Sequence, residues 1–256
     1  MLMKKLLWTA CAAIALTASA GINAEEYVVG TGATYRPFEY ETPQKELVGF
    51  DVDLMRAIAK AEGFDVKFIN TPWEGIFATV DKGDRDIIMS GITITDKRKQ
   101  VVDFSKPYFL AHQLILMTDK SVKINKLSDL SKGSVAVVSG SAGDVAASKA
   151  FGKASTRIRR FDNTPLALEE LNQGGVVAAI GDIGVLAFYA RNNPDKHFNM
   201  TRDPAFEEQY FGIAVKKGNQ KLIDKINAGL EKVIASGEYN KIYRKWFGTD
   251  APKLPQ

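Results

Sequence analysis

The sequence predicts an α/β protein of two lobes joined by a two-strand hinge. Three observations carry this prediction. Strand-like apolar runs alternate with segments of helical periodicity, this alternation is present in two successive blocks, and the tail after Tyr210 does not continue the second block. Alternating strands and helices are typical of domains in which helices cover mainly parallel sheets.

The first block supplies one set of strands and helices. In order, the expected elements are a strand at 27–32, a helix at 51–59, a strand at 66–69, a helix at 73–81 and a short buried strand at 87–89. In the first helix Val52, Met55 and Ile58 recur on one face, which indicates an amphipathic helix. Gly63 is the residue at which this helix should end.

The second block repeats this order from Lys132 onward and predicts a second α/β unit. Its expected elements are a strand at 135–138, a glycine- and serine-rich turn at 139–144 that leads into a helix, a strand at 158–161, a helix at 165–172 and a strand at 176–180. Turns of this composition commonly join a strand to a helix.

The tail differs from both blocks. It contains an apolar strand at 211–215, a helix at 220–235 and an amphipathic helix at 239–247. A third domain of this size would be too small to fold alone, so the tail should return to the first lobe.

The chain would then cross between the lobes twice, near 108–113 and near 207–211. These two crossings are the expected hinge. The expected organisation is a signal peptide at 1–24, a first lobe at 25–110 and 208–256, and a second lobe at 111–207.

The N-terminus has the three parts of a secretory signal peptide. Lys4 and Lys5 precede an apolar run at 6–16, and small residues follow it. Cleavage after Ala20 or after Ala24 fits those small residues, and we prefer Ala24 because a charged segment follows it. The apolar run is much shorter than the roughly 20 residues that cross a bilayer, and no later segment is long and uncharged enough. The sequence therefore predicts a soluble, periplasmic protein.

Cys11 is the only cysteine of the chain. A lipid-anchored protein would need this cysteine at the end of the apolar run, but the run continues past it to Leu16. Removal of the signal peptide therefore leaves no cysteine, no disulfide and no thiol chemistry. About 230 residues must then be stabilised by burial alone, which is ample for one or two domains.

The charge balance argues against a nucleic-acid partner. The formal net charge is +4, and removal of Lys4 and Lys5 lowers it to about +2 because no acid lies in the first 24 residues. Arg157, Arg159 and Arg160 do cluster, but their alternation with apolar residues indicates a strand with one solvated face.

Five short motifs, in their order and spacing, resemble one protein family. They are Tyr35-x-Pro37-Phe38, Val48-Gly49-Phe50-Asp51-Val52-Asp53-Leu54, Ser90-Gly91-Ile92-Thr93-Ile94-Thr95-x-x-Arg98, Asp103-Phe104-Ser105-x-Pro107-Tyr108 and Gly237-x-Tyr239-x-x-Ile242-x-x-Lys245-Trp246-Phe247-Gly248. The chain resembles, over nearly its whole length, the type II periplasmic binding proteins of polar amino-acid ABC importers. These include glutamine-, histidine- and lysine/arginine/ornithine-binding proteins. The resemblance implies a monomer that captures a free polar amino acid by hinge closure and delivers it to an inner-membrane permease.

Arg98 is the candidate partner of the ligand's carboxylate. A guanidinium group meets two carboxylate oxygens at once, which a lysine cannot do. Spacing alone would equally place Arg98 on the surface, but it matches the family's carboxylate-binding arginine. Ser90, Gly91 and Thr93 lie just after the buried strand at 87–89, where main-chain groups and a hydroxyl can reach a ligand. Thr93 resembles the family's hydroxyl contact, and its alternative role is that of an ordinary strand residue.

The second lobe offers three candidate contacts. Ser141 and Ala142 lie where a turn meets a helix start, so free amide groups and the helix dipole favour an anion there. Similar turns occur in many α/β proteins that bind nothing. Asp182 resembles the carboxylate that binds the ligand's ammonium, and it is equally a candidate helix N-cap.

Tyr35 and Trp73 are the candidate aromatic walls around the ligand's side chain. Both follow predicted strands and lie beside prolines, at Pro37 and Pro72. Loops at the carboxyl ends of strands face the crevice in proteins of this class, although aromatic residues there are more often core.

The identity of the ligand stays open. Gly32 stands where several relatives carry an acid that helps to bind a cationic or amide side chain, and Val138 and Gly181 replace a lysine and a histidine of the enteric glutamine binder. Glutamine or another neutral polar amino acid is therefore the first expectation. A basic amino acid held by cation–π contacts is the second. Glu39 could replace the missing acid, although the sequence favours a solvent-facing glutamate.

Enzymatic alternatives have less support. His112 and His197 are the only histidines, no metal-ligand spacing is present, and no nucleophile-elbow motif surrounds Ser90 or Ser141. A cyclohexadienyl-dehydratase-like enzyme is the better rival, because such enzymes share this scaffold. It would need a free general acid in the cleft, whereas Asp182 is expected to bind the ammonium group. We therefore expect a binding protein with no metal and no cofactor.

Overall fold

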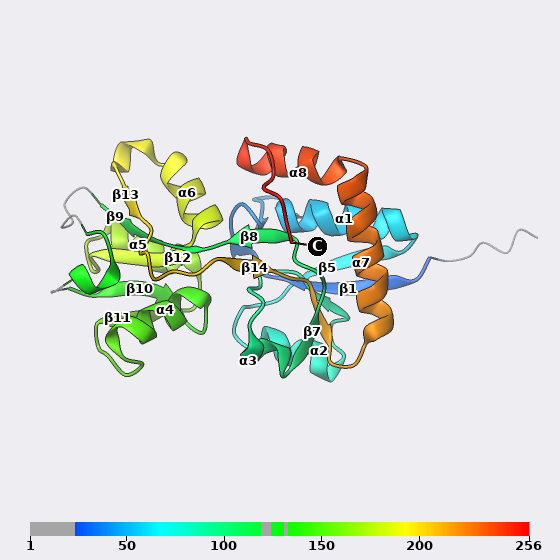
Figure 1. The fold of residues 1–256 in the computed structure, drawn as a ribbon, viewed down its shortest axis with the longest axis horizontal. Coiled ribbons are helices and arrows are strands. Elements are labelled where there is room, and N and C mark those ends of the chain that lie inside the picture. Colours follow the sequence, from blue (N-terminus) through cyan, green and yellow to red (C-terminus); the bar gives the residue numbers. More distant parts are fainter. Residues whose placement is uncertain (1–23, 119–123, 131–132, 256) are drawn as a thin grey trace, which may run out of the picture.

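The computed structural model describes residues 24–118, 124–130 and 133–255. Residues 1–23 of the predicted signal peptide, among them Cys11, lie outside the described residues. Figure 1 shows two lobes side by side, connected by the strands β8 (Phe109–Ala111) and β14 (Gln209–Phe211). Among the described residues, no helix is both long and apolar enough to cross a membrane.

The first lobe is built on a five-stranded sheet in the order β5-β1-β6-β15-β7. Its strands are β1 (Glu26–Thr31), β5 (Asp65–Asn70), β6 (Ile87–Ile88), β7 (Val102–Phe104) and β15 (Ala214–Lys216). Its helices are α1 (Phe50–Glu62), α2 (Ile76–Lys82), α3 (Asp96–Lys99), α7 (Gln220–Ala235) and α8 (Glu238–Phe247). A small antiparallel sheet adds β2 (Thr34–Tyr35), β3 (Glu39–Glu41) and β4 (Leu47–Val48).

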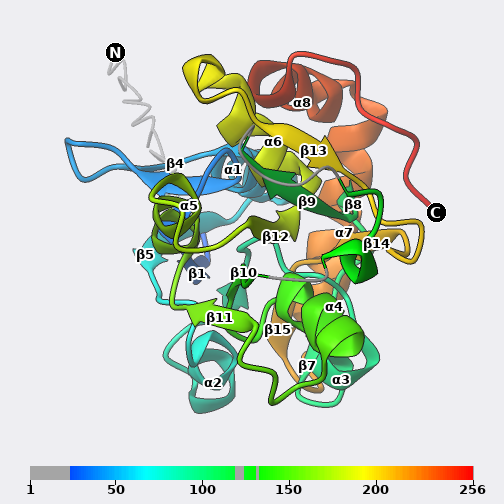
Figure 2. The same cartoon turned by 90° about the vertical axis from the view of Figure 1, so that its left-hand side faces the viewer.

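The second lobe is built on a five-stranded sheet in the order β11-β10-β12-β9-β13. Its strands are β9 (Gln113–Met117), β10 (Val135–Val138), β11 (Ile158–Phe161), β12 (Ala178–Asp182) and β13 (Asn199–Thr201). Its helices are α4 (Ala142–Phe151), α5 (Thr164–Asn172) and α6 (Ile183–Arg191), with short 3₁₀ turns at Leu127–Asp129 and Pro194–Lys196. Figure 2, which views the molecule from this side, shows α4 and α5 on either side of the sheet.

The two sheets follow the same plan. In each, three parallel strands are joined by a fourth, antiparallel strand that enters from the connection: β15 follows β14, and β9 follows β8. The connecting strands β8 and β14 pair with each other. The predicted fold class, two α/β lobes joined by two strands, is confirmed.

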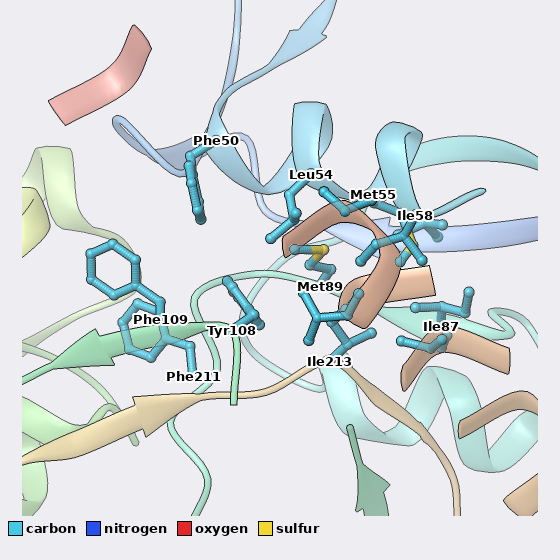
Figure 3. Close-up of a cluster of buried hydrophobic side chains, with 14 of the residues drawn as sticks. Phe50, Leu54, Met55, Ile58, Ile87, Met89, Tyr108, Phe109, Phe211 and Ile213 are labelled. Carbon is cyan, nitrogen blue, oxygen red and sulfur yellow. The ribbon is translucent and has the colours of Figure 1, made fainter. Parts of the chain in front are cut away.

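The first lobe has a large core that extends into the connection, and a smaller one, which includes Ile76 and Ile88, on the other face of its sheet. Figure 3 shows Leu54, Met55 and Ile58 projecting from α1 toward Met89. Met55 and Ile58 lie on the face that the periodicity predicted, and Leu54, which it did not include, is buried beside them. The core continues through aromatic rings to the connecting strands, where the rings of Phe109 and Phe211 stack at 5.5 Å between centroids.

The second lobe has two smaller cores, one on each face of its sheet. Val135 and Val137 of β10 belong to one cluster, and Ala136 between them belongs to the other. Alternation of this kind follows from the period-two geometry of a strand.

Three predicted elements have different bounds for local reasons. The helix expected at 73–81 begins only at Ile76, because Gly75 has a left-handed backbone (φ 79°). The strand expected at 176–180 is shifted to β12, which pairs with β10 from Ala178 onward. The strand expected at 211–215 is divided at Gly212 into β14 and β15, because the chain there leaves the connection and enters the sheet of the first lobe.

Candidate ligand-binding site

A cavity of about 370 Å³ lies between the lobes, and all nine residues predicted from the sequence border it. From the first lobe these are Tyr35, Trp73, Ser90, Gly91, Thr93 and Arg98, and from the second they are Ser141, Ala142 and Asp182. They are brought together because they follow the carboxyl ends of the parallel strands β1, β5, β6, β10 and β12. Ligands bind at such strand ends in open α/β sheets.

The Arg98 guanidinium lies in the cavity wall rather than on the surface. One terminal nitrogen donates to the Thr93 carbonyl at 2.8 Å, and the other donates to the Gly140 carbonyl of the second lobe at 3.3 Å. The guanidinium carbon lies 5.1 Å from the ring centroid of Trp73 and 5.5 Å from that of Phe77. Burial lowers the pKa of Arg98 to about 10, so it remains a cation at neutral pH. Because a guanidinium group has five N–H donors, those that make no bond to Thr93 or Gly140 can still donate to a ligand carboxylate.

Asp182 carries the opposing charge on the second lobe. Its carboxylate is buried and accepts hydrogen bonds from the Tyr35 hydroxyl and from the Gln113 side-chain amide, the latter at 2.7 Å. Burial raises the pKa of Asp182 to about 6, although both hydrogen bonds and the charge of Arg98 act in the opposite direction. Asp182 precedes α6 at the N-cap position, but its side chain makes no capping hydrogen bond. The carboxylate is therefore directed at the cavity's other groups and keeps acceptor capacity for an ammonium ion.

Ser141 and Ala142 bring the N-terminus of α4 to the cavity. The Ser141 hydroxyl caps this helix by accepting from the Asp144 amide at 3.2 Å. This cap uses an oxygen lone pair and leaves the hydroxyl proton available to a ligand. The helix end also offers its first-turn amides and its dipole, both of which favour an anion.

Three hydrogen bonds cross the cleft beside the cavity, and a fourth joins the lobes elsewhere, from the Arg191 guanidinium to the Phe247 carbonyl at 3.4 Å. The Trp73 indole donates to the Ser139 carbonyl at 3.0 Å, Arg98 donates to the Gly140 carbonyl, and Tyr35 donates to Asp182. The two lobes are therefore in contact over the cavity, and any separation of the lobes must break these bonds.

Ser90 and Gly91 hold the floor of the cavity. The Ser90 hydroxyl accepts from the Gly32 amide at 3.0 Å and donates to Glu39 at 2.7 Å. Gly91 has a positive φ of 54°, and a Cβ there would lie 2.6 Å from the Tyr35 ring. Only glycine fits this close approach.

Glu39 corrects the sequence interpretation. The sequence favoured a solvent-facing glutamate, but Glu39 is 0% exposed and borders the cavity. Burial, together with the neighbouring Asp51 carboxyl, raises the pKa of Glu39 well above its ordinary range, and burial raises that of Asp51 to about 7. Nothing in the local pattern around Pro37 signals this burial, because it depends on the approach of α1.

The sequence also missed other polar groups of the site. Gln113, which is 2% exposed, supports Asp182 from the start of β9. Glu74 and Asp162 are exposed acids that border the cavity from opposite lobes. A polar residue that interrupts the apolar segment 108–117 was the one available signal for Gln113.

The comparison with protein families gives one match over nearly the whole described chain. Residues 27–249 match the family described as bacterial extracellular solute-binding proteins, family 3.

Individual relatives carry the names of amino-acid binders. The chain is 42% identical over 252 residues to the "Probable histidine-binding protein" of Neisseria gonorrhoeae, covering 94% of each chain. Its fold is similar to that of the arginine-, lysine-, histidine-binding protein ArtJ of Geobacillus stearothermophilus, with a TM-score of 0.84 and 43% identity over 90% of this chain and 97% of that one.

A third relative bears on the enzymatic alternative. An ancestral amino acid-binding protein, described as a precursor of cyclohexadienyl dehydratase, has a TM-score of 0.79 and 37% identity, with 87% of this chain and 95% of that one covered.

Proposed function

The chain belongs to family 3 of the bacterial extracellular solute-binding proteins, and from this premise we propose that it captures a polar L-amino acid in the periplasm for an ABC importer. In this role it acts as a monomer, closes around the ligand and delivers it to an inner-membrane permease.

The observation that carries the proposal is the pair of opposite charges across one cavity. Arg98 on the first lobe complements an α-carboxylate, and Asp182 on the second complements an α-ammonium. A site closed from water must neutralise both charges of a zwitterion, because an unpaired buried charge is very costly. Thr93, Ser90 and the N-terminus of α4 supply the remaining polar contacts.

Hinge closure follows from the distribution of these groups. Neither lobe alone holds both charges, so a bound zwitterion favours the arrangement in which the lobes meet. Small-angle scattering with and without saturating ligand tests this. A smaller radius of gyration with ligand is expected, and an unchanged radius would refute closure.

We propose a basic amino acid as the first ligand class and a neutral polar one, such as glutamine, as the second. This reverses the order expected from the sequence. The reason is the acids that border the cavity besides Asp182, which are Glu39, Glu74 and Asp162. The names of the Neisseria and Geobacillus relatives support the same order. Tyr35 and Trp73 then border the aliphatic part of the side chain.

A thermal-shift screen tests the proposal directly. The purified protein is unfolded and refolded to strip any carried-over ligand, and its melting temperature is measured with each of the 20 amino acids, ornithine and citrulline. A rise with arginine, lysine, ornithine or histidine is expected, because a ligand that binds only the folded state stabilises it. A rise with neutral polar amino acids alone would restore the order expected from the sequence, and no rise with any of the amino acids tested would refute amino-acid binding.

The dehydratase alternative has weaker support. The relative named in that connection is itself described as an amino acid-binding precursor. Glu39 borders the cavity and has a pKa raised well above its ordinary range by burial and by the Asp51 carboxyl, so its proton is expected to be shared with Asp51. Turnover of prephenate or arogenate by the purified protein would overturn the binding role.

A further inference from the structure

Two carboxyl groups are buried together beneath the floor of the cavity. Glu39 from β3 is 0% exposed and Asp51 from α1 is 1% exposed. One oxygen of each, Glu39 Oε2 and Asp51 Oδ1, has no donor among the described residues. Two buried carboxylates cannot both remain charged at contact, so the pair holds a proton that satisfies both oxygens.

The other oxygens of the pair are held by neutral donors. The Ser90 hydroxyl donates to Glu39 Oε1 at 2.7 Å, while the Gly91 amide and the Tyr108 hydroxyl donate to Asp51 Oδ2 at 2.9 and 2.8 Å. The titratable groups that interact with the pair from other elements are Tyr35, Tyr108 and Asp182, and Arg98 acts on Tyr35 and Asp182. No cation among the described residues forms a salt bridge with either carboxyl.

The pair is open to the cavity through one of its members. Glu39 borders the cavity, whereas Asp51 lies behind it. Gly32 places no side chain in the way: a Cβ there would lie 3.2 Å from the Ser90 hydroxyl and 3.9 Å from Glu39 Oε1. A ligand side chain can therefore come next to the Glu39 carboxyl at the point where a larger residue at position 32 would stand.

We propose that a ligand with a cationic side chain displaces the proton shared by Glu39 and Asp51, whereas a neutral side chain leaves that proton in place. This inference rests on the proposed binding function. A cation beside Glu39 compensates the carboxylate charge as the proton did, so the proton passes to the solvent. The two carboxyls and the ligand cation together then have the same net charge as the two carboxyls and the proton had before. The same site thus accommodates a cationic side chain when the pair has lost its proton and a neutral side chain when the pair keeps it.

Arginine and citrulline form the matched ligand pair for a test, because citrulline has the same length and no charge. Titration calorimetry is carried out at pH 7.5 in two buffers with different ionisation enthalpies. Asp182 is already ionised at this pH and contributes little. Arginine should release about one proton per site and citrulline about none.

Glu39→Gln is the matched variant. Its amide keeps the shape of the protonated acid, accepts from Ser90 and donates to Asp51. It should bind citrulline or glutamine within a few-fold of the unmodified protein, bind arginine at least about tenfold more weakly and release no proton. Glu46→Gln, the same change at an exposed position outside the cavity, should leave every quantity unchanged.

The outcomes separate the inference from the function on which it rests. Arginine binding without proton release, or release that persists in Glu39→Gln, overturns the inference alone. Binding of neutral amino acids with no binding of arginine or lysine between pH 6 and 9 also overturns it and leaves the binding function intact. If no amino acid binds, the proposed function itself fails.

Discussion

In the hydrogen bonds across the cavity, the first lobe contributes side-chain donors, whereas the second lobe contributes mainly main-chain acceptors. In the three hydrogen bonds that span the cleft beside the cavity the donor is a side chain of the first lobe: Trp73, Arg98 or Tyr35. The acceptors are two main-chain carbonyls of the β10–α4 turn and one carboxylate, that of Asp182. Because carbonyls are present whatever the sequence, we expect discrimination among ligands to be concentrated in the first lobe and in Asp182.

The cores of the lobes are consistent with this division. The larger of the first lobe's two cores continues through Phe109 and Phe211 into the connection, so its cavity residues rest on the larger packed unit. The second lobe also has a core on each face of its sheet, and both are smaller than that unit. We therefore expect the first lobe to act as the binding platform and the second to act as the cover that closes over it.

The largest loss of amino-acid affinity should come from removing the positive charge of the platform, that of Arg98. Arg98→Ala should weaken amino-acid affinity by roughly 30-fold to several thousandfold, because loss of one partner of a buried charge pair costs about 2 to 5 kcal/mol. Arg98→Lys should lie between Arg98→Ala and the unmodified protein, since it keeps the charge without the planar fork. Lys97→Ala, at the exposed neighbouring position, is the control. Calorimetric affinities equal to those of the unmodified protein would place the carboxylate elsewhere.

The second-largest loss of affinity should come from removing the charge of Asp182, the charged acceptor that the cover contributes. Asp182→Asn keeps an acceptor but loses the charge, so affinity should fall by about tenfold to 150-fold, as for a hydrogen bond to a charged group worth about 1.5 to 3 kcal/mol. Circular dichroism checks that the fold is retained. An effect larger than that of Arg98→Ala would reverse the assignment of platform and cover.

A pH titration sharpens the role of Asp182. Its pKa, raised to about 6 by burial, lies within reach of a mild acid buffer. Below that pH the carboxyl becomes neutral and can no longer pair with an ammonium group. The affinity for a neutral amino acid should therefore be constant above about pH 7 and roughly tenfold weaker at pH 5. In Asp182→Asn this decline should disappear, and its persistence would assign the titration to another group.

Local sequence patterns were sufficient for most elements, and together with the family resemblance they supplied the nine candidate residues that border the cavity. The strands at 135–138 and 158–161 and the helix at 220–235 have the predicted bounds, because period-two and period-3.6 patterns are local properties. The candidate residues follow strand ends, and the parallel arrangement then brings them to one edge. Their roles in binding remain predictions, as do the lobe boundaries.

The local patterns could not supply contacts between distant segments. Glu39 is buried because α1 brings Asp51 against it, an approach allowed by Gly49, where a Cβ would lie 2.0 Å from the Phe38 carbonyl oxygen. Gln113 meets Asp182 because β9 and β12 pair in one register, Gln113 opposite Asp182. Both contacts depend on tertiary packing, which a single sequence does not reveal.

The smallest loss of affinity should come from changes at Trp73. Two variants separate the two roles of this side chain. Trp73 stacks near Arg98 and also donates to the Ser139 carbonyl of the cover. Trp73→Phe removes the donor and keeps an aromatic ring, so we expect a loss of affinity of about fivefold or less, similar for all ligands. Trp73→Ala removes the ring as well, and its additional loss should fall on ligands with long side chains, such as arginine compared with serine. Uniform weakening in both variants would make Trp73 a contact between platform and cover only, and selective weakening in Trp73→Ala would make it a wall of the side-chain pocket.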